Sequence, residues 1–356
     1  MRTGQATLDD PSALKKADPG GMLEVVGGLG SQLREGFDLG RGAAGLPSTQ
    51  GVGSVAVCGM GGSGIVGDVL KASLADRLPI PVVIVKGYRL PAFCAEDTLV
   101  LAVSYSGDTE ETLAAYAQAV SAGCRVIVVS SGGELAGLAR ADGVPHVAVP
   151  GHVPAPRAAL GYLAGAAIGI LDGIGLAAEA GADVAQASDA LEALAAELGP
   201  DRQAGVNRAK SLALWLLGRI PVVWGSEGEA EAAALRWRTQ FNENAKVPAF
   251  SAVLPELDHN EIEGWTGEVG RSFGLVVLRH GREHPRIAPR VAATMQAIAG
   301  SGLESREVHA EGLTSMEVLF SLVMMGDFVS AYLAVLRGVD PMPVRGLTRL
   351  KQRLRS

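Results

Sequence analysis

Residues 98 to 112 read TLVLAVSYSGDTEET, an apolar run that changes abruptly into a polar one. The first six residues are those that favour a buried strand, and a helix is expected to begin near Glu110. A buried strand that leads directly into a helix is the repeating unit of a parallel α/β sheet. This stretch therefore predicts an α/β fold.

The same pattern recurs along the chain. Residues 51–60 form a strand-like run that ends in a glycine cluster, and a helix is expected at residues 65–74. Further strands of the first half are expected at residues 80–87, 98–104, 125–131 and 146–150. Those of the second half are expected at residues 219–228, 246–253, 273–280 and 305–312. The second half is thus a weak structural echo of the first.

We therefore expect two flavodoxin-like or Rossmann-like parallel-sheet domains, at residues 51–178 and 209–356. A helical connector at residues 179–208 joins them. Residues 1–50 contain a possible helix at 21–37 and a loop rich in Gly, Ala and Pro. We expect this segment to be an N-terminal helix and arm that packs on a neighbour.

The composition argues against binding to nucleic acid or to a membrane surface. The 356-residue chain has a formal net charge of -7 and no evident basic cluster, whereas both functions need a concentrated basic surface. The apolar runs at residues 158–171 and 318–336 are expected to be buried helices, because the first is short for a membrane span and Asp327 interrupts the second.

The cysteines and the N-terminal residues favour a cytoplasmic protein. Cys58, Cys94 and Cys124 are widely spaced beside apolar runs, which predicts reduced core residues and neither a disulfide framework nor a metal site. The N-terminal residues are charged and include no apolar core, so we expect no secretory signal.

The glycine cluster GMGGSG at residues 59–64 also fits the dinucleotide-binding pattern G-x-G-x-x-G. That pattern alone is weak. It further requires an acidic residue at the end of the next strand, where Val85, Lys86 and Gly87 stand instead. The sequence thus favours another use for this turn.

Three hydroxyl side chains, Ser104, Ser106 and Thr109, surround Gly107 where the strand at residues 98–104 ends. Hydroxyls and backbone donors at a helix N-terminus suit a phosphate group, which offers several acceptor oxygens. The alternative is that Asp108 or Thr109 only caps the helix. A cap uses one side chain, so three hydroxyls and a glycine within six positions indicate a phosphate-binding loop.

These motifs carry a family resemblance. GMGGSGIVGD at residues 59–68 and SYSGDTEET at 104–112 resemble the sugar isomerase (SIS) domain. Further motifs resemble one branch, the bifunctional phosphoglucose/phosphomannose isomerases: PRAALGYL at 156–163, QFNENAKVPAF at 240–250, PELDHNEIEGW at 255–265 and DPMPVRGLTRLKQRL at 340–354. The resemblance covers nearly all of the chain after residue 50.

The resemblance implies two SIS-type domains, a homodimer with active sites between subunits, no metal and no nucleotide cofactor. By position it places Ser63, Ser104, Ser106 and Thr109 on the phosphate, and Gly61 and Gly62 along the sugar. It makes Glu243 the base that moves a proton between C1 and C2, and His259 a ring-opening group that reaches in from the other subunit. Arg157 would stabilise the enediolate, and Lys351 would be a second charged group nearby.

The residue types agree with that chemistry. Aldose–ketose isomerisation without a metal needs a carboxylate base, a cation for the enediolate and an acid or base for the ring oxygen. The expected reaction converts glucose 6-phosphate and mannose 6-phosphate to and from fructose 6-phosphate through a cis-enediol. Met342 stands where family members often carry Thr, in a region connected with handling the mannose epimer.

Alternatives remain for each residue and for the whole chain. Glu243 could be a surface or capping carboxylate, His259 a solvated loop residue, Arg157 a helix-start residue and Lys351 one charge on a solvated helix face. The chain could also be a sugar-phosphate-binding regulatory protein without turnover, or an isomerase of another phosphosugar. A regulator usually carries a basic recognition helix, which this sequence lacks.

Overall fold

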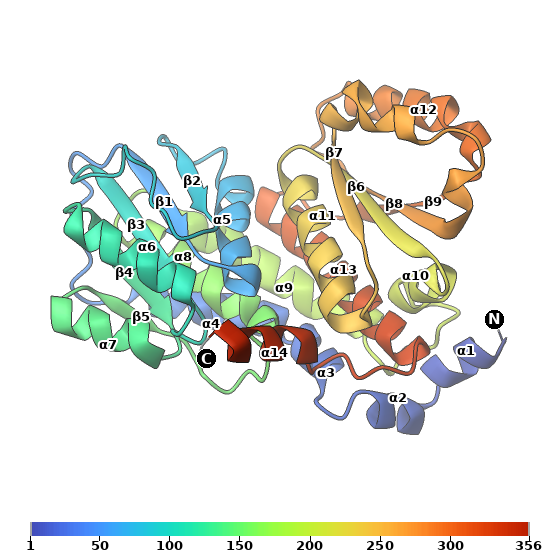
Figure 1. The fold of residues 1–356 in the computed structure, drawn as a ribbon, viewed down its shortest axis with the longest axis horizontal. Helices are drawn as coiled ribbons and strands as arrows, with labels where there is room; N and C mark the ends of the chain where they lie inside the picture. The colour runs from blue at the N-terminus through green and yellow to red at the C-terminus, as the bar shows by residue number, and fades with distance from the viewer. Residues whose placement is uncertain (1, 355–356) are drawn as a thin grey trace.

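The structure is a computed structural model that describes residues 2–354 and contains two parallel β-sheets with helices around them (Figure 1). The strands of the first sheet are β1 Ser54–Cys58, β2 Val82–Val85, β3 Thr98–Val103, β4 Arg125–Ser130 and β5 His146–Ala148. Those of the second are β6 Ile220–Ser226, β7 Phe250–Leu254, β8 Phe273–His280 and β9 Glu304–Ala310. The strand orders are β2-β1-β3-β4-β5 and β7-β6-β8-β9, which confirms the predicted α/β fold with two parallel sheets.

The helices fall into four groups along the chain. The N-terminal group is α1 Arg2–Leu8, α2 Pro11–Ala17, α3 Met22–Gly27 and α4 Leu29–Arg41. The helices that lie between or after the strands of the first sheet are α5 Gly61–Ser73, α6 Glu110–Ser121, α7 Gly133–Asp142 and α8 Leu160–Gly173. Two helices connect the sheets, α9 Ala180–Leu198 and α10 Arg208–Leu216. The last group is α11 Glu229–Gln240, α12 Ile287–Ala297, α13 Ser315–Leu336 and α14 Arg345–Leu354.

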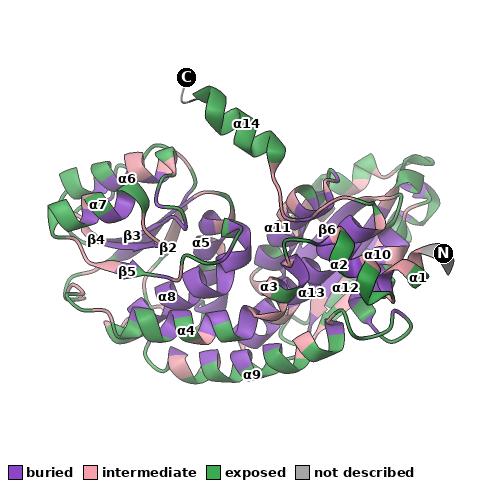
Figure 2. Ribbon diagram, turned by 90° about the horizontal axis from the view of Figure 1, so that it is seen from below, coloured by how far each residue is buried: buried purple, intermediate pink, exposed green. Residues whose placement is uncertain are grey.

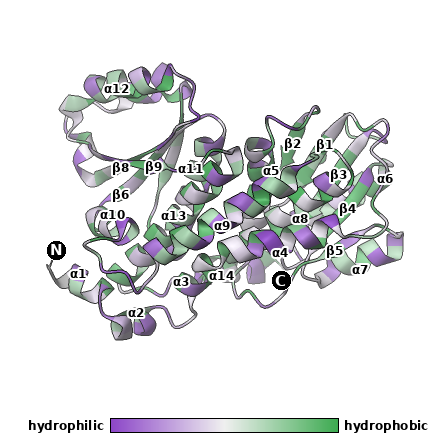
Figure 3. Ribbon diagram, turned by 180° about the vertical axis from the view of Figure 1, so that it is seen from behind, coloured by the Kyte–Doolittle hydropathy of each residue, from purple (hydrophilic) through white to green (hydrophobic). Residues whose placement is uncertain are grey.

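The first sheet is buried on both faces because successive strand residues point to opposite sides. Val57 and Leu101 pack in the same cluster as residues of α5 and α8, whereas Ala56 and Val100 pack with residues of α6 and α7. Strands β1 and β3 are therefore buried throughout and are mainly apolar, in agreement with the hydropathy colours in Figure 3. This explains the continuous apolar runs in the sequence.

The second sheet follows the same rule. Val223 and Leu278 pack against α11 and α13, and Trp224 and Val277 pack against α12. Because α5 contacts both α11 and α13, one apolar cluster continues from the first sheet to the second. The two halves thus share a core between the sheets.

Helix α13 is the most deeply buried part of this core. Among the described residues it is the one helix long and apolar enough to cross a membrane, and 94% of its most apolar window is buried inside the fold. It is capped by Thr314, whose hydroxyl accepts from the amide of Glu317. The prediction of a buried helix in this region is confirmed.

The N-terminal segment packs on helices of its own chain, and its expected packing on a neighbour stays a prediction. Helix α4 lies directly on α8, and the glycines at their contact allow the backbones to touch. A Cβ atom at Gly40 would stand 2.0 Å from the carbonyl oxygen of Ala166, and one at Gly169 would stand 2.1 Å from that of Phe37. Side chains larger than hydrogen cannot fit there.

Several element boundaries also differ from those expected. The helix at residues 21–37 is two helices, α3 and α4, which meet at Gly28. Helix α5 begins at Gly61 and not at residue 65, so the glycine cluster forms its first turn. Strand β7 begins at Phe250, because a π-helical turn at Phe241–Ala245 and an extended segment precede it.

The three cysteines lie in or beside the core, which agrees with the predicted burial. Cys58 and Cys94 are buried, Cys124 is half-buried, and all three are unpaired. Burial raises the pKa of the Cys58 thiol to about 12, so it stays protonated at neutral pH. They are core residues.

Candidate active site

The predicted hydroxyl residues lie together where β1 and β3 end. Ser63 Oγ accepts a hydrogen bond from the amide of Tyr105 at 3.0 Å, which joins the two loops. Ser104 Oγ lies 3.0 Å from Thr109 Oγ1. Ser63 and Ser104 are buried, whereas Ser106 is exposed and Thr109 is half-buried. Ser106 and Thr109 are therefore the members of this cluster that a ligand can reach directly.

Helix α6 begins in this loop with its amide groups facing outward from the helix end. Thr109 is its N-cap residue, but among the described residues its side chain makes no capping bond and pairs with Ser104 instead. Asp108 Oδ1 accepts from the amide of Glu134, in the first turn of α7. The side chains of the loop thus do not cap α6. The amide groups at the N-terminus of this helix are therefore suited to binding an anion.

The glycine turn brings this loop next to Arg157. Gly61 has a φ of +53° and no atom within 4 Å of the place of a Cβ, so the space above it is open. Gly62 lies against Arg157: a Cβ there would stand 2.6 Å from the Cα of Arg157. Ser63 follows directly. The residues expected on the phosphate and the sugar therefore adjoin the expected cation.

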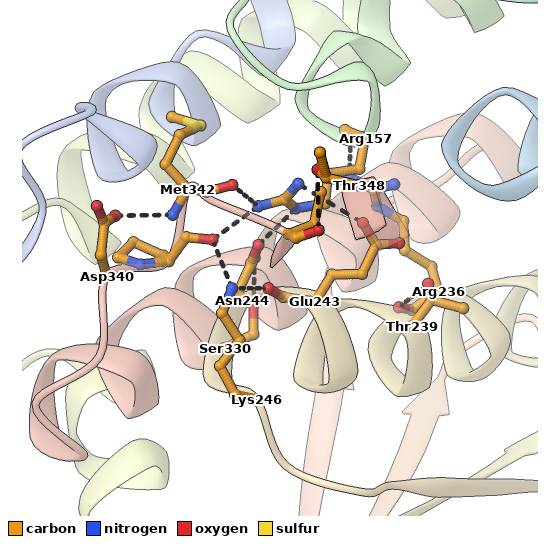
Figure 4. Close-up of polar contacts among 12 residues, drawn as sticks. Arg157, Arg236, Thr239, Glu243, Asn244, Lys246, Ser330, Asp340, Met342 and Thr348 are labelled. Carbon is orange, nitrogen blue, oxygen red and sulfur yellow. Dashed lines mark hydrogen bonds and ion pairs between the residues drawn. The ribbon is translucent and has the colours of Figure 1, made fainter. Parts of the chain in front are cut away.

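Arg157 is held in one orientation before any ligand arrives. It lies in a short 3₁₀ turn, Pro156–Ala159, and only 3% of it is exposed. Its Nε donates to Asn244 Oδ1 at 2.7 Å, and one terminal nitrogen donates to the carbonyl oxygens of Pro341 and Met342 at 2.7 and 2.9 Å (Figure 4). Burial lowers the pKa of Arg157, an effect that Glu243 opposes.

The remaining terminal nitrogen of Arg157 faces Glu243. It lies 3.5 Å from the Oε2 atom of Glu243, whose side chain is 24% exposed. Among the described residues this nitrogen makes no hydrogen bond, so its N–H groups are directed at the carboxylate and the space beside it. A partly exposed carboxylate opposite a buried guanidinium is suited to proton transfer with stabilisation of the resulting charge.

Glu243 stands in the π-helical turn, a feature that is frequent at functional sites. The asparagines on both sides of it anchor the turn. Asn242 Oδ1 accepts from the amide of Ala249 at 3.1 Å, and Asn244 donates to Ser330 Oγ at 2.9 Å. The two flanking amides therefore fix the backbone on which Glu243 stands.

A buried ion pair supports Arg157 from behind. Arg236 and Asp327 are 2% and 3% exposed and form a two-point contact with distances of 3.0 and 2.6 Å. Arg236 also donates to the carbonyl oxygen of Arg157 at 2.8 Å. Burial raises the pKa of Asp327, and Arg236 opposes that rise. The sequence motifs did not point to Arg236. The signal that could have found it is a charged residue within the buried, alanine-rich α11, together with the opposite charge of Asp327 within the apolar α13.

His259 does not join this cluster within one chain. Glu243 precedes β7 and His259 follows it, so the whole strand lies between them, and among the described residues no hydrogen bond or ion pair joins the two side chains. His259 is exposed, in a 3₁₀ turn that Asp258 ties to Arg290 and Thr294 of α12 at 3.0 and 2.7 Å. The structure therefore places His259 at the far edge of the second sheet.

Lys351 also stands apart. It is exposed on α14, and among the described residues no contact joins it to Arg157 or Glu243. Met342, in the position where the family often has Thr, contributes to the site through its backbone, because its carbonyl oxygen accepts from Arg157. The chain thus assembles Arg157, Glu243 and the hydroxyl loop, but neither His259 nor Lys351.

Comparison with known proteins identifies the family. Residues 205–354 match the bacterial phospho-glucose isomerase C-terminal SIS domain. The chain is 34% identical over 335 residues to the bifunctional phosphoglucose/phosphomannose isomerase of Caldicellulosiruptor bescii, covering 94% of this chain and 98% of that protein. The chain belongs to the bifunctional phosphoglucose/phosphomannose isomerase family. It is therefore an isomerase, as its motifs indicated.

Two further comparisons agree. The bifunctional phosphoglucose/phosphomannose isomerase of Aquifex aeolicus is 35% identical over 304 residues, with 85% of this chain and 90% of that protein covered. A hypothetical protein from Thermus thermophilus superposes with a TM-score of 0.70 at 17% identity, covering 99% of this chain and 94% of that one. The latter shows that the fold is shared.

Proposed function

We propose that this family member converts glucose 6-phosphate and mannose 6-phosphate to and from fructose 6-phosphate, without a metal, through a cis-enediol. The observation that carries the proposal is the buried Arg157, oriented toward Glu243 at 3.5 Å beside a hydroxyl loop. The family assignment supports the reaction class, since the relatives bear the names of both isomerase activities.

The phosphate binds at the N-terminus of α6. Ser106 and Thr109 donate hydroxyl groups to it, and the first amides of the helix complete its coordination. Ser63 and Ser104 are buried, and they hold the two loops in register, because their hydroxyls accept from the amides of Tyr105 and Gly107. The sugar then extends over Gly61, toward Arg157.

Glu243 moves the proton. Its carboxylate removes the proton from C2 of the open-chain aldose phosphate, and the electron pair of that C–H bond forms the C1–C2 double bond while O1 takes the negative charge. Arg157 donates to the enediolate oxygens from its uncommitted nitrogen. Glu243 then returns the proton to C1, while the O2 proton is transferred to O1, so that O1 becomes the C1 hydroxyl and the C2 carbonyl of the ketose forms.

A second subunit supplies His259 in this proposal. The chain itself keeps His259 at the far edge of the second sheet, so a homodimer with shared sites is the arrangement that brings it near the ring oxygen of the substrate. Lys351 would approach only if α14 moves. A cytoplasmic location completes the proposal, in keeping with three unpaired cysteines.

The deciding experiment is a coupled assay of fructose 6-phosphate formation from each aldose phosphate, with a chelator present. Wild type, Glu243→Gln and a control carboxylate variant, Glu192→Gln on the exposed face of α9, are compared. We expect turnover of both sugars by the wild type and the control, and loss of turnover with retained binding in Glu243→Gln. Binding without turnover in the wild type would indicate the regulatory protein or another phosphosugar.

The shared site has its own test. Glu243→Gln and His259→Gln proteins are each expected to be inactive, but a mixed dimer contains one site with both wild-type residues. After subunit exchange the mixture should therefore recover about a quarter of wild-type activity, because half of the dimers are mixed and each has one intact site. No recovery after proven exchange would place His259 in its own chain's site or outside the reaction.

A further inference from the structure

The two sheets differ in their number of strands. By chain order and by pairing, β6, β7, β8 and β9 of the second sheet correspond to β1, β2, β3 and β4 of the first. The first sheet continues with β5, whose Val147 stands opposite Val129 of β4. Among the described residues no strand pairs with the outer edge of β9, which ends the second sheet (Figure 1). The second sheet thus has no counterpart of β5.

The length of the chain after β9 explains the difference. In the first domain β4 ends at Ser130 and α8 begins at Leu160, and the residues between them form α7 and β5. Helix α13 is the counterpart of α8, because α13 packs on α11 as α8 packs on α5. Strand β9 ends at Ala310 and α13 begins at Ser315. The intervening residues 311–314 are too few for a helix and a strand.

A cavity of about 720 Å³ lies at the position of the absent strand. One wall is β9 from Arg306 to Ala310. Helices α9, α10 and α13 form the other walls, with Leu194, Leu212 and Leu322 among the lining residues. In the first domain α4 contacts both α8 and β5, and in the second α9 and α10 contact α13. Helices α9 and α10 therefore border the cavity as α4 borders β5.

The backbone of β9 can hydrogen-bond to a strand placed in this cavity. An edge strand presents a row of unpaired N–H and C=O groups along its outer side. Apart from the pairing with β8, no backbone group of residues 306–310 bonds to another backbone group in the part of the chain that the structure describes. At about 3.3 Å for each residue, these residues form an edge about 17 Å long. An extended segment of about five residues can therefore pair with β9.

The two faces of such a segment would meet different surroundings. Val308 packs against the shared core, and Arg306, on the same face of β9, lies over the ring of Trp215 at 5.3 Å. Glu307 points to the opposite face. Side chains of neighbouring strands meet face by face. Alternate residues of the added segment would thus meet the apolar walls, and the residues between them would lie beside Glu307.

The charged residues around the cavity are mainly acidic. Four carboxylates line it with two guanidinium groups and one imidazole: Glu197, Glu307, Glu311, Glu317, Arg208, Arg306 and His309. Arg208 serves both Glu197 and Glu311, at 3.7 and 4.0 Å. The carboxylates therefore exceed the cations that line the cavity.

Two of these carboxylates have further partners. Glu317 Oε2 accepts from the amides of Leu313 and Thr314, so it is used at the start of α13. Glu307 lies 2.9 Å from His309, and 3.4 Å from an arginine of β8 that pairs more closely with another glutamate. The side chain of Glu311 is 89% exposed. Glu307 and Glu311 are thus the carboxylates at which a basic side chain of a ligand gains most.

We propose that the cavity beside β9 binds an extended peptide segment of a partner protein, which pairs with β9 as a fifth strand of the second sheet. The segment alternates apolar residues, on the face of Val308, with basic residues, beside Glu307 and Glu311. This site goes beyond the proposed isomerase reaction, because Arg157 and Glu243 do not line the cavity.

A second copy of this chain fits the cavity less well. If β9 of one copy paired with β9 of another, Glu304 and Glu307 of both strands would be brought to one contact. Like charges on neighbouring strands are destabilising, and charged side chains on an edge strand act against pairing with other copies. Charge complementarity therefore favours a basic partner segment.

The test is a binding measurement by fluorescence anisotropy on the full chain. The probe is a labelled peptide of alternating lysine and valine, as long as the 7 residues of β9. A peptide of the same composition with its valines in one block is the control for charge. We expect the alternating peptide to bind at least about tenfold more tightly, because only its valines share one face of a strand.

Variants of the protein locate the site. Helix α9 has exposed residues over much of its length (Figure 2), among them Ala190 and Ala193 in the cavity wall. Ala190→Trp with Ala193→Trp fills the cavity and should weaken binding by about tenfold or more, whereas Ala185→Trp, exposed on α9 outside the cavity lining, should not. Glu307→Gln with Glu311→Gln should weaken the lysine peptide by about threefold and leave a serine–valine peptide unaffected.

Hydrogen exchange provides a second measurement that needs no variant. The bound alternating peptide should slow amide exchange in residues 304–312, as expected for a newly paired strand edge. The proposal is overturned if the wild type does not bind this peptide, if the block peptide binds equally well, or if the protection lies elsewhere. A change of oligomeric state in the folded Ala190→Trp, Ala193→Trp protein without peptide would assign the cavity to a second copy and also overturn it.

Discussion

Replacing Gly62 by alanine tests whether the position of Arg157 sets the rate. The added Cβ would stand 2.6 Å from the Cα of Arg157 and 2.9 Å from its backbone nitrogen. Ordinary van der Waals contact begins at 3.4 Å, so the two backbones must separate by about 0.8 Å. Both atoms are backbone atoms, and no side-chain rotation can relieve the contact.

That shift is large for a site of this kind. The Nε of Arg157 is tied to Asn244 at 2.7 Å and its carbonyl oxygen to Arg236 at 2.8 Å, so a displaced backbone turns the guanidinium relative to Glu243. Misplacement by about 1 Å can cost on the order of a hundredfold in rate. Overpacking costs about 1–3 kcal/mol of stability. We expect kcat to fall by about a hundredfold, while KM changes little because the hydroxyl loop is intact.

The assay compares kcat and KM for each aldose phosphate, together with urea unfolding. Gly137→Ala is the matched control: it lies within α7, and no atom stands within 4 Å of the place of its Cβ. This control should keep full activity and gain about 0.5–1 kcal/mol of stability. A folded Gly62→Ala protein with wild-type kcat would refute the view that the orientation of Arg157 toward Glu243 limits the reaction.

Two further predictions concern buried charge. Asp327→Ala leaves Arg236 buried without its partner, so urea unfolding should show a loss of about 3–5 kcal/mol, and the paired change Arg236→Met with Asp327→Leu should recover much of it. Burial lowers the pKa of His280 below its usual 6.5, so the folded state holds this ring neutral. The free energy of unfolding should then be constant above about pH 6.5 and fall as the pH drops below that value. The fall should be smaller in His280→Gln, whereas the exposed His284→Gln should follow the wild type.

The sequence predicts well those features that neighbouring residues determine. The run at residues 98–103 is apolar on both faces because helices cover both sides of β3, and that requirement is visible in the residues themselves. The hydroxyl loop is similar, because Ser104 and Thr109 are five residues apart and their contact follows from the turn between strand and helix. Local geometry therefore sufficed to predict that these two hydroxyls lie together, and their binding of a phosphate stays a prediction.

The supporting contacts could not be predicted in this way. Arg236 and Asp327 are 91 positions apart, and their pairing depends on how α11 packs on α13. Asn244 meets Arg157 across 87 positions. The contact of α4 with α8 could not be predicted for a related reason: the glycines of the two helices are unremarkable separately, and only their juxtaposition shows a backbone contact. Partners distant in sequence are chosen by tertiary packing, which the sequence does not state.

The need to orient the N–H donors of Arg157 explains why so many polar groups are buried around its guanidinium. A buried guanidinium is costly unless every N–H group has a partner, and the carbonyl oxygens of Pro341 and Met342 together with Asn244 satisfy one side of it. Among the described residues, Glu243 is the carboxylate that forms an ion pair with the other side of the guanidinium, at 3.5 Å. In the proposed reaction, an enediolate that forms beside Glu243 gains a fully oriented donor without any rearrangement. Interactions that are completed only when charge develops are those that lower the barrier. In this arrangement, the hydrogen bond from the uncommitted nitrogen of Arg157 to the enediolate is that interaction.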